Sequence, residues 1–421
     1  MRDSVFLCNL ALWLIVLFPS KVISLELNYE FGTQYRSSEN ILLVSDQQIE
    51  PPQSEITQVT FLNFQLEENS ADLRAQFNAD IRHSAYRNDT FNNESDTSIN
   101  AELLWDISPR RYSWYFFERY TQLEEDANNI QTIENQQNIN EIISGPNFRW
   151  QLGRANWLEL DARLYSYYFE ASDADNERVS TIFRWIKSLV PGLDINITYD
   201  MLTTEFQDES VNTNFTRAST FVGFNYERSV NNVQLNLGKS RLSDDNTSVD
   251  DSDYVDLIAT RQISASSNVS MSFRQDIGDS SSELENGLSI VAGNFKQKSS
   301  SIQYTQSTTT GSWGIHFVSV IRNDVISADY EVEDNLTLDL NRVVGVGSRI
   351  SIAFQTTNQE IENALLGNYT DTINSAVITY DHRFSRRLSV TLSSEKLDRI
   401  STEQLRNYKD ERIQITLSFR G

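Results

Sequence analysis

The sequence predicts an all-β protein, a single transmembrane antiparallel β-barrel in a bacterial outer membrane. Three observations predict this fold: a recurring alternation of apolar and polar residues, an apolar segment at the N-terminus, and connections that alternate between short and long. The clearest alternation is Ala71–Arg82, ADLRAQFNADIR. Because successive side chains of a β-strand point to opposite faces, this segment is a strand with one apolar face and one polar face.

The N-terminal residues 1–24 resemble a secretory signal peptide. Arg2 supplies a positive charge, Val5–Phe18 is an almost unbroken apolar run, and Val22–Ser24 provide a cleavage site before Leu25. The apolar run is shorter than the roughly 20 residues that a membrane-spanning helix needs. We therefore expect a cleaved signal peptide over 1–24 and one outer-membrane β-barrel over 25–421, with an N-terminal anchor helix as the alternative.

Composition narrows the class of protein. The only cysteine, Cys8, lies inside the predicted signal, so the mature chain has no disulfide and no thiol catalysis. The net charge of −24 argues against nucleic acid as a partner. A mean hydropathy of −0.44 fits a barrel, because only alternate residues of its strands meet lipid.

Alternating segments bounded by turn residues recur to the end of the chain, and we count about twenty. The clearest, in order, are Ala71–Arg82, Asn100–Ile107, Asn147–Leu152, Leu158–Tyr165, Asp194–Met201, Arg217–Glu227, Val233–Leu237, Val269–Asp276, Trp313–Ile321, Leu336–Asn341, Ile350–Gln355, Ala376–Phe384, Leu388–Ser393 and Arg412–Phe419. Bacterial single-chain barrels have an even number of strands, so we expect 20 strands, with 18 as the next choice.

The connections between these segments alternate in length. Short ones include 108–110, 153–156, 190–192, 230–232, 265–268 and 385–386. The longer polar ones are 37–55, 88–98, 124–140, 208–215, 241–252, 278–287, 360–371 and 400–410. Outer-membrane barrels have short periplasmic turns and longer extracellular loops, whereas a soluble sandwich has no reason to keep this order.

Aromatic residues and the last strand favour the same fold. Several tryptophans lie near the expected strand ends, where amphipathic rings prefer the membrane interfaces: Trp105, Trp114, Trp150, Trp157, Trp185 and Trp313. The final segment Arg412–Phe419 has an apolar face that ends in an aromatic residue, as the C-terminal strands of outer-membrane proteins do, although Arg420 and Gly421 follow it.

Catalytic and metal-binding signals are weak. None of the three histidines, His83, His316 and His382, has a carboxylate-and-nucleophile pattern beside it, so we predict no enzyme, no catalytic residue and no cofactor. The acidic stretch Asp244–Asp253 could bind calcium, but it lacks the glycine and the terminal glutamate of an EF-hand loop. We expect it to be a solvated outer loop and predict no metal site.

The polar face of the strands is the better functional candidate, because it lines the lumen of a barrel. Arginine and carboxylate side chains there could create a transverse field and hydrogen-bond sugars or acidic polymers. The simpler alternative is that they pair across neighbouring strands and stabilise a wet interior. The lumen-lining candidates are Arg74, Asp80, Arg149, Arg163, Arg217, Arg274, Asp339 and Arg412.

Several local features resemble the beta-barrel porin 2 family of exopolysaccharide-associated and PEP-CTERM-associated outer-membrane proteins. The first strand, Leu25–Tyr35, is followed by Ser38–Ile41, and a loop with Pro51 and Pro52 leads to the paired strands Ile56–Leu66 and Ala71–Tyr86. Further on, Gly145 and Pro146 precede Phe148–Leu152, and Tyr165–Phe169 ends a long aromatic strand. The resemblance implies a channel or accessory for exopolysaccharide export, with outer-membrane lipid, polysaccharide and periplasmic export machinery as partners.

Two other classes of function stay open on the sequence alone. One is a non-conducting structural or adhesive outer-membrane barrel, whose acidic loops would carry the function. The other is a secreted soluble β-protein, such as a sandwich array or a lectin. Cell fractionation separates the soluble protein from either barrel.

Overall fold

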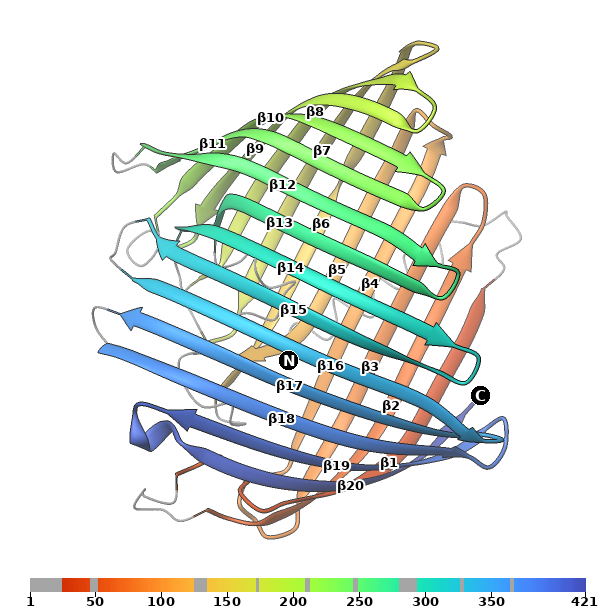
Figure 1. The fold of residues 1–421 in the computed structure, drawn as a ribbon, viewed down its shortest axis with the longest axis vertical. Coiled ribbons are helices and arrows are strands. Elements are labelled where there is room, and N and C mark those ends of the chain that lie inside the picture. The colour runs from red at the N-terminus through yellow and green to blue at the C-terminus, as the bar shows by residue number, and fades with distance from the viewer. Residues whose placement is uncertain are drawn as a thin grey trace.

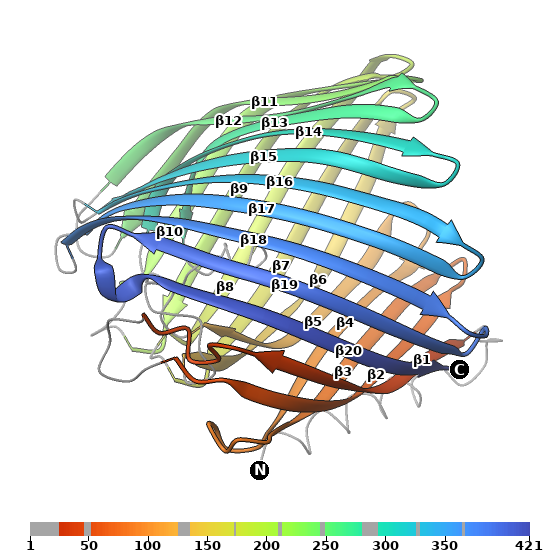
Figure 2. The same ribbon diagram turned by 60° about the horizontal axis from the view of Figure 1, so that its bottom comes forward.

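The structure, a computed structural model, describes residues 25–45, 52–124, 135–171, 174–208, 213–244, 249–279, 294–325, 329–363 and 367–421. Its strands form one antiparallel sheet of 20 strands that closes into a barrel, since β1 pairs with both β2 and β20 (Figures 1 and 2). The predicted fold class and strand number are confirmed. The predicted signal peptide, residues 1–24, lies outside the described residues.

Each strand pairs with its neighbour in the sequence. The first ten are β1 Glu26–Ser38, β2 Glu55–Asn69, β3 Leu73–Tyr86, β4 Glu94–Ser108, β5 Tyr112–Glu124, β6 Gln136–Gly153, β7 Asn156–Phe169, β8 Asn176–Val190, β9 Leu193–Phe206 and β10 Phe215–Arg228. The second ten are β11 Asn231–Asp244, β12 Val249–Ser264, β13 Ser267–Asp279, β14 Asn294–Thr308, β15 Gly311–Asp324, β16 Tyr330–Gly345, β17 Ser348–Asn363, β18 Gly367–Arg383, β19 Leu388–Ser401 and β20 Tyr408–Arg420. A short 3₁₀ helix, η2 Gln404–Arg406, precedes β20.

The two ends of the barrel differ, as the connection lengths predict. At one end the strands are joined by turns of two to four residues, and β1 begins and β20 ends there (Figure 1). At the other end most connections are longer, but 241–252 and 360–371 are not the long loops expected. The strands β11 and β12 reach Asp244 and Val249, and β17 and β18 reach Asn363 and Gly367, so only short connections remain.

The acidic stretch Asp244–Asp253 is therefore mostly strand, and the expectation of a solvated loop was wrong. Two of its carboxylates pair with cations of β11: Lys239 Nζ lies 2.6 Å from Asp253, and Arg241 Nε lies 2.8 Å from Asp251. These cross-strand pairs offset the repulsion between the acids and let β12 begin at Val249.

Four strands, β5, β8, β12 and β14, lie outside the strand segments that the alternation and the family resemblance predict. In β5, YSWYFFERYTQLE, aromatic residues occupy both faces and hide the period of two. In β14, NFKQKSSSIQYTQST, polar residues do the same. Pairing with the neighbouring strands places these segments in the sheet, although their own sequence patterns do not predict it.

The outer face of the sheet carries the apolar half of the alternation. Large apolar side chains are exposed there strand after strand, as in Phe183, Ile197, Val222, Ile352 and Ile415. Such a wide exposed apolar band is what lipid covers in a barrel. No helix in the described ranges is long and apolar enough to cross a membrane.

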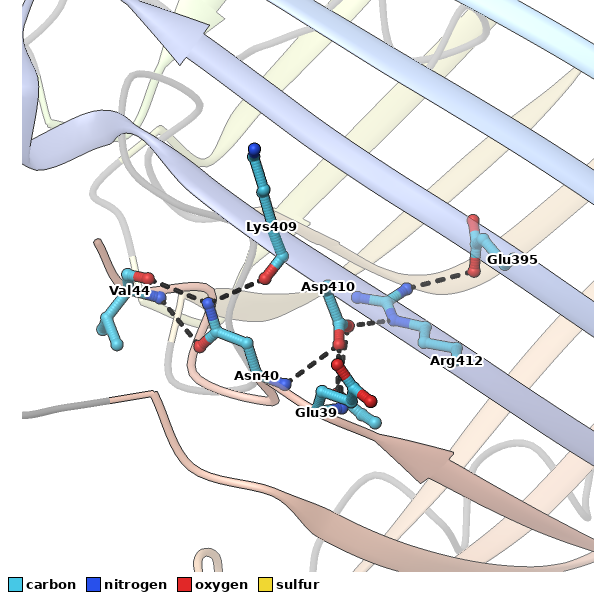
Figure 3. A network of polar contacts seen from close by, with 8 residues as sticks. Glu39, Asn40, Val44, Glu395, Lys409, Asp410 and Arg412 are labelled. Carbon is cyan, nitrogen blue, oxygen red and sulfur yellow. Dashed lines mark hydrogen bonds and ion pairs between the residues drawn. The ribbon is translucent and has the colours of Figure 1, made fainter. Parts of the chain in front are cut away.

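The seam where β1 meets β20 is reinforced at the long-loop end. The buried carboxylate of Asp410 accepts hydrogen bonds from Ser38 Oγ at 2.8 Å and from the backbone N–H groups of Glu39 and Asn40, both at 3.0 Å (Figure 3). Asn40 Nδ2 donates to the carbonyls of Val44 and Lys409. Residues 39–45 thus fold onto the inner side of β20 and stay there.

Candidate functional site

The inner face of the barrel is identified by contacts between strands that are two places apart. The Arg163 guanidinium on β7 lies 5.2 Å from the ring of Tyr115 on β5, and Phe221 on β10 stacks on Tyr254 of β12 with ring centroids 4.6 Å apart. Side chains of next-but-one strands converge only on the concave side of a curved sheet. The cross-strand register then carries this inner face around the barrel, and alternate residues of every strand belong to it.

Glycines on the strand between make these contacts possible. Gly238 lies between Phe221 and Tyr254, and an added Cβ there would stand 2.5 Å from Phe221 Cβ. Gly145 lies between Arg163 and Tyr115, and its Cβ would stand 1.9 Å from the Ala162 carbonyl oxygen. A side chain reaches over the bare backbone in each case.

The eight predicted lumen-lining residues all lie on this inner face, distributed over seven strands around the barrel rather than gathered in one cluster. Arg149 lies 3.1 Å from Glu159, Arg163 lies 2.8 Å from Asp161, and Asp80 lies 2.7 Å from Arg82. Most of these charges are thus paired, but of these three pairs only Arg149 with Glu159 crosses between neighbouring strands, as the simpler alternative expects; the other two lie within one strand. Contact with a passing solute stays a prediction.

Arg412 supports the seam. Its Nε donates to Asp410 at 2.5 Å, and its Nη1 lies 3.4 Å from Glu395 (Figure 3). By contrast, Arg74 and Asp339 have no side-chain partner among the described residues. Asp339 lies beside Gly314, whose missing side chain leaves it space. These two are the predicted residues that remain available to solvent or solute.

Arg217 and Arg274 lie where β13 bends inward. Arg217 Nη1 donates to the Ile277 carbonyl at 3.0 Å, and Arg274 Nη2 lies 3.1 Å from Asp276. Ile277 is fully buried against Phe215 and Leu242. The last register pair between β12 and β13 is Val255 with Gln275, so the end of β13 leaves β12 and packs across the inner face of β10 and β11.

The inner face of β5–β8 is rich in arginine, and we call it the basic wall. Its five cations are Arg119, Arg149, Arg163, Arg178 and Arg184, and its three acids are Glu141, Glu159 and Asp161. The pairs are close: Arg119 Nη2 lies 2.6 Å from Glu141, and Glu159 lies between Arg149 and Arg184. Two cations are left in excess.

The inner face of β16–β18 has the opposite balance, and we call it the acidic wall. Its acids are Glu331, Glu333, Asp339, Asp371 and Asp381, and its own cations, Arg349 and Arg383, both lie at the short-turn end. Glu331 is held by Arg322 of β15 at 2.9 Å, and Asp371 is held by Arg399 and Arg406. Glu333, near the long-loop end of β16, and Asp339, near its middle, face the lumen without an ion-pair partner on the same wall among the described residues.

The two walls face each other. In a closed ring of 20 strands, β16–β18 lie ten places from β6–β8, which is half the circumference. The front and back walls of the barrel show this separation (Figure 1). Opposite charge excess on facing walls is the arrangement that a transverse field needs, and the field itself stays a prediction.

The alternation of apolar and polar residues does not predict every charged residue of the two walls. Arg119 lies in β5, where aromatic residues hide the pattern, and Arg178 lies near the start of β8, which shows no clear alternation. Asp371 was placed in a loop, but it belongs to β18. In Tyr112–Glu124, a single arginine within a run of aromatic residues was the available sign that Arg119 lies on the inner face.

Metal and catalytic clusters find no support in the described part of the chain. No group of three or more His, Cys, Asp or Glu side chains is arranged there to hold a metal ion. His83 contacts Ser95 Oγ at 2.9 Å, and His382 contacts Ser348 Oγ at 2.8 Å. Neither contact includes a carboxylate.

Solved structures of outer-membrane barrels share this fold. The FrpB iron transporter from Neisseria meningitidis in its apoprotein form has a TM-score of 0.52 at 8% identity, covering 93% of this chain and 81% of that chain. A mutant ferric enterobactin receptor of Pseudomonas aeruginosa bound to enterobactin has a TM-score of 0.50 at 9% identity, covering 96% and 82%. No family model and no curated protein matches the sequence. The chain therefore has an outer-membrane β-barrel fold of the kind found in transporters.

Proposed function

We propose that the protein is a passive outer-membrane channel that passes, or helps to export, exopolysaccharide. The observation that carries the proposal is the inner face itself, a polar surface with an arginine excess on β5–β8 and a carboxylate excess on β16–β18. Hydroxyl-rich polymers can exchange hydrogen bonds with such a wall at every step.

The compartment and partners follow from the same proposal. The exposed apolar outer face would lie in outer-membrane lipid, with the short turns in the periplasm and residues 1–24 removed after export. Periplasmic export machinery would deliver the polymer to the short-turn end. The resemblance of Leu25–Tyr86 and Gly145–Phe169 to the beta-barrel porin 2 family supports this role, and the protein would not be an enzyme.

Two measurements test the channel. Purified protein reconstituted into a planar bilayer should give stepwise ionic conductance, because a polar lumen this wide holds water. Deletion of the gene should reduce surface polysaccharide, and a chain with the barrel intact should restore it. Absence of conductance together with unchanged surface polysaccharide would refute the proposal.

A non-conducting structural barrel is the second candidate. It is favoured by two segments that fold onto the inner face at the long-loop end: residues 39–45, held by Asp410, and the end of β13, held by Arg217 and by Ser240 Oγ, which donates to Asp276 at 3.0 Å. Conductance that is nil in the intact protein but appears in Asp410→Ala would favour this candidate.

A further inference from the structure

A groove crosses the inner face of the first five strands. Its floor is the backbone of five residues that follow one another in register across β1–β5: Tyr29, Phe64, Ala79, Ile99 and Tyr120. Its two rims are the side chains on either side of these residues. Neighbouring strands lie 4.7–4.9 Å apart, so the groove is roughly 19 Å long from β1 to β5. Its volume of about 610 Å³ is that of a small-molecule site.

The two rims differ in composition, and one of them is made largely of carboxamides. One rim consists of Asn28, Gln65, Asn78, Asn100 and Arg119, each in register with the next. The other rim consists of Arg420, Glu30, Asn63, Asp80 and Ser98, also in register. Four amides in five successive positions across a barrel wall form a continuous polar rail.

Of the four amides of this rail, Gln65 is used by the fold, since its Nε2 donates to Glu67 at 2.6 Å, and the other three are free of such contacts within the described residues. The side chains of Asn28, Asn78 and Asn100 have no hydrogen-bond partner among the residues that the structure describes. On the opposite rim, Oδ1 of Asn63 is buried and also lacks a partner there. Polar groups without partners inside a protein carry a free-energy cost unless water or a ligand satisfies them.

The groove is nearly neutral, because its charges are already paired. Arg420 Nε lies 2.8 Å from Glu30, Asp80 is bound by Arg82, and Arg119 is bound by Glu141. An anionic or cationic ligand would have to break these pairs. A ligand with hydroxyl groups and no charge would not, because each amide offers it two donors and an acceptor.

The groove also has a direction. Asn28 lies close to Glu26, the first residue of β1 at the short-turn end, whereas Arg119 lies in the middle of β5. Strand tilt carries the rail from the short-turn end up to mid-height. A ligand that enters from that end therefore meets the amides first and the arginines of the basic wall next.

From these observations we infer that the groove over β1–β5 is a binding site for an uncharged saccharide chain. This inference rests on the proposed channel, and it specifies where the polymer is held and which class of polymer is preferred. Its hydroxyl groups would exchange hydrogen bonds with Asn78 and Asn100 along one rim while the paired charges stay intact.

Binding and conductance together test the inference. Wild-type protein in a detergent without a sugar headgroup should bind maltohexaose in a calorimetric titration, and should bind tetragalacturonate more weakly. Asn78→Ala with Asn100→Ala should lower the maltohexaose affinity about tenfold, since two hydrogen bonds are lost. The matched control, Asn225→Ala with Gln355→Ala, removes two inner-face amides outside the groove and should leave the affinity unchanged.

The possible outcomes distinguish the proposed saccharide groove from the proposed channel. Equal losses in both double variants, no maltohexaose binding by the folded wild type, or tighter binding of tetragalacturonate would overturn the saccharide groove. A barrel that conducts but binds no maltohexaose would lose the groove and keep the channel. A barrel that binds maltohexaose through Asn78 and Asn100 but never conducts would keep the groove and lose the channel.

Discussion

The basic wall on β5–β8 and the acidic wall on β16–β18 are built from the same kind of alternating strand, yet they hold their charges differently. On the basic wall each of three acids is bound by an arginine of the same wall, as in Arg119 with Glu141. On the acidic wall, Glu331 and Asp371 pair with cations of β15, of β19 and of the segment before β20, while Glu333 and Asp339 form no ion pair within the described residues. Pairing satisfies the first wall, whereas the second leaves free carboxylates in the lumen.

The difference shows that charge on an inner wall has two uses. Paired charges stabilise a wet interior at little cost to neutrality. Unpaired charges create a potential that acts on solutes. The facing arrangement of the two walls places both uses at one level of the lumen.

The largest effect should come from the glycine that lets the basic wall close. Gly145→Val places a Cβ 1.9 Å from the Ala162 carbonyl, which is backbone and cannot move aside. We expect a loss of about 3 kcal/mol or more in unfolding free energy, seen as loss of heat-modifiable migration on gels. Ala353→Val, at an inner position of the acidic wall that already carries a Cβ, is the control. Normal folding of the Gly145→Val variant would contradict the claim that the close approach of Ala162 requires a glycine at position 145.

The next largest effect should separate the two faces of the acidic wall. Phe354→Lys puts a cation on the exposed outer face at the middle of β17, at a cost of about 2–4 kcal/mol in lipid. Gln355→Lys, one residue away on the inner face, should fold normally. Urea unfolding of the two variants in lipid vesicles measures both, and equal stabilities would mean that the faces are wrongly assigned.

A smaller effect should follow from opening one pair of the basic wall. In Arg119→Met the only hydrogen bond left to the buried Glu141 from the described residues is the one from Tyr167 OH at 2.8 Å, so we expect a loss of about 1–3 kcal/mol in unfolding free energy. Lys239→Ala removes an exposed ion pair on β11 and should have no measurable effect. A similar loss in both variants would mean that burial of the Arg119–Glu141 pair makes no difference to its contribution to stability.

The smallest effect in energy should be on ion selectivity. Glu333→Gln with Asp339→Asn removes the free carboxylates of the acidic wall and should shift the reversal potential in a salt gradient toward anion preference. Arg178→Gln with Arg184→Gln on the basic wall should shift it the other way. Shifts of the same sign for both pairs would contradict opposed walls.

Much of this architecture follows from local patterns. A period of two reports which residues share a face, and so Arg163 and Asp339 could be placed on one surface without any contact information. The pattern fails where both faces have the same character, as in β5, and where ion pairs hold acids in a strand, as with Asp251 and Asp253.

The candidate sites themselves depend on register between distant strands. Asn28 and Asn100 lie on one rail only because three consecutive strand pairings align them. The inward bend of β13 depends on Ile277 meeting Phe215 and Leu242, residues far away in the sequence. No local pattern contains this information, which explains why the groove and the bend were not predicted.

The central claim is that the polar face of every strand lines a water-filled lumen. Cysteine labelling along β3 tests this claim most directly. In a Cys8→Ser background, single cysteines at positions 74–82 would be treated with a charged, water-soluble maleimide in reconstituted vesicles. The account predicts labelling at Arg74, Gln76, Asn78 and Asp80 and protection at Ala75, Phe77 and Ala79. Labelling at the odd positions with protection of the even ones would contradict it.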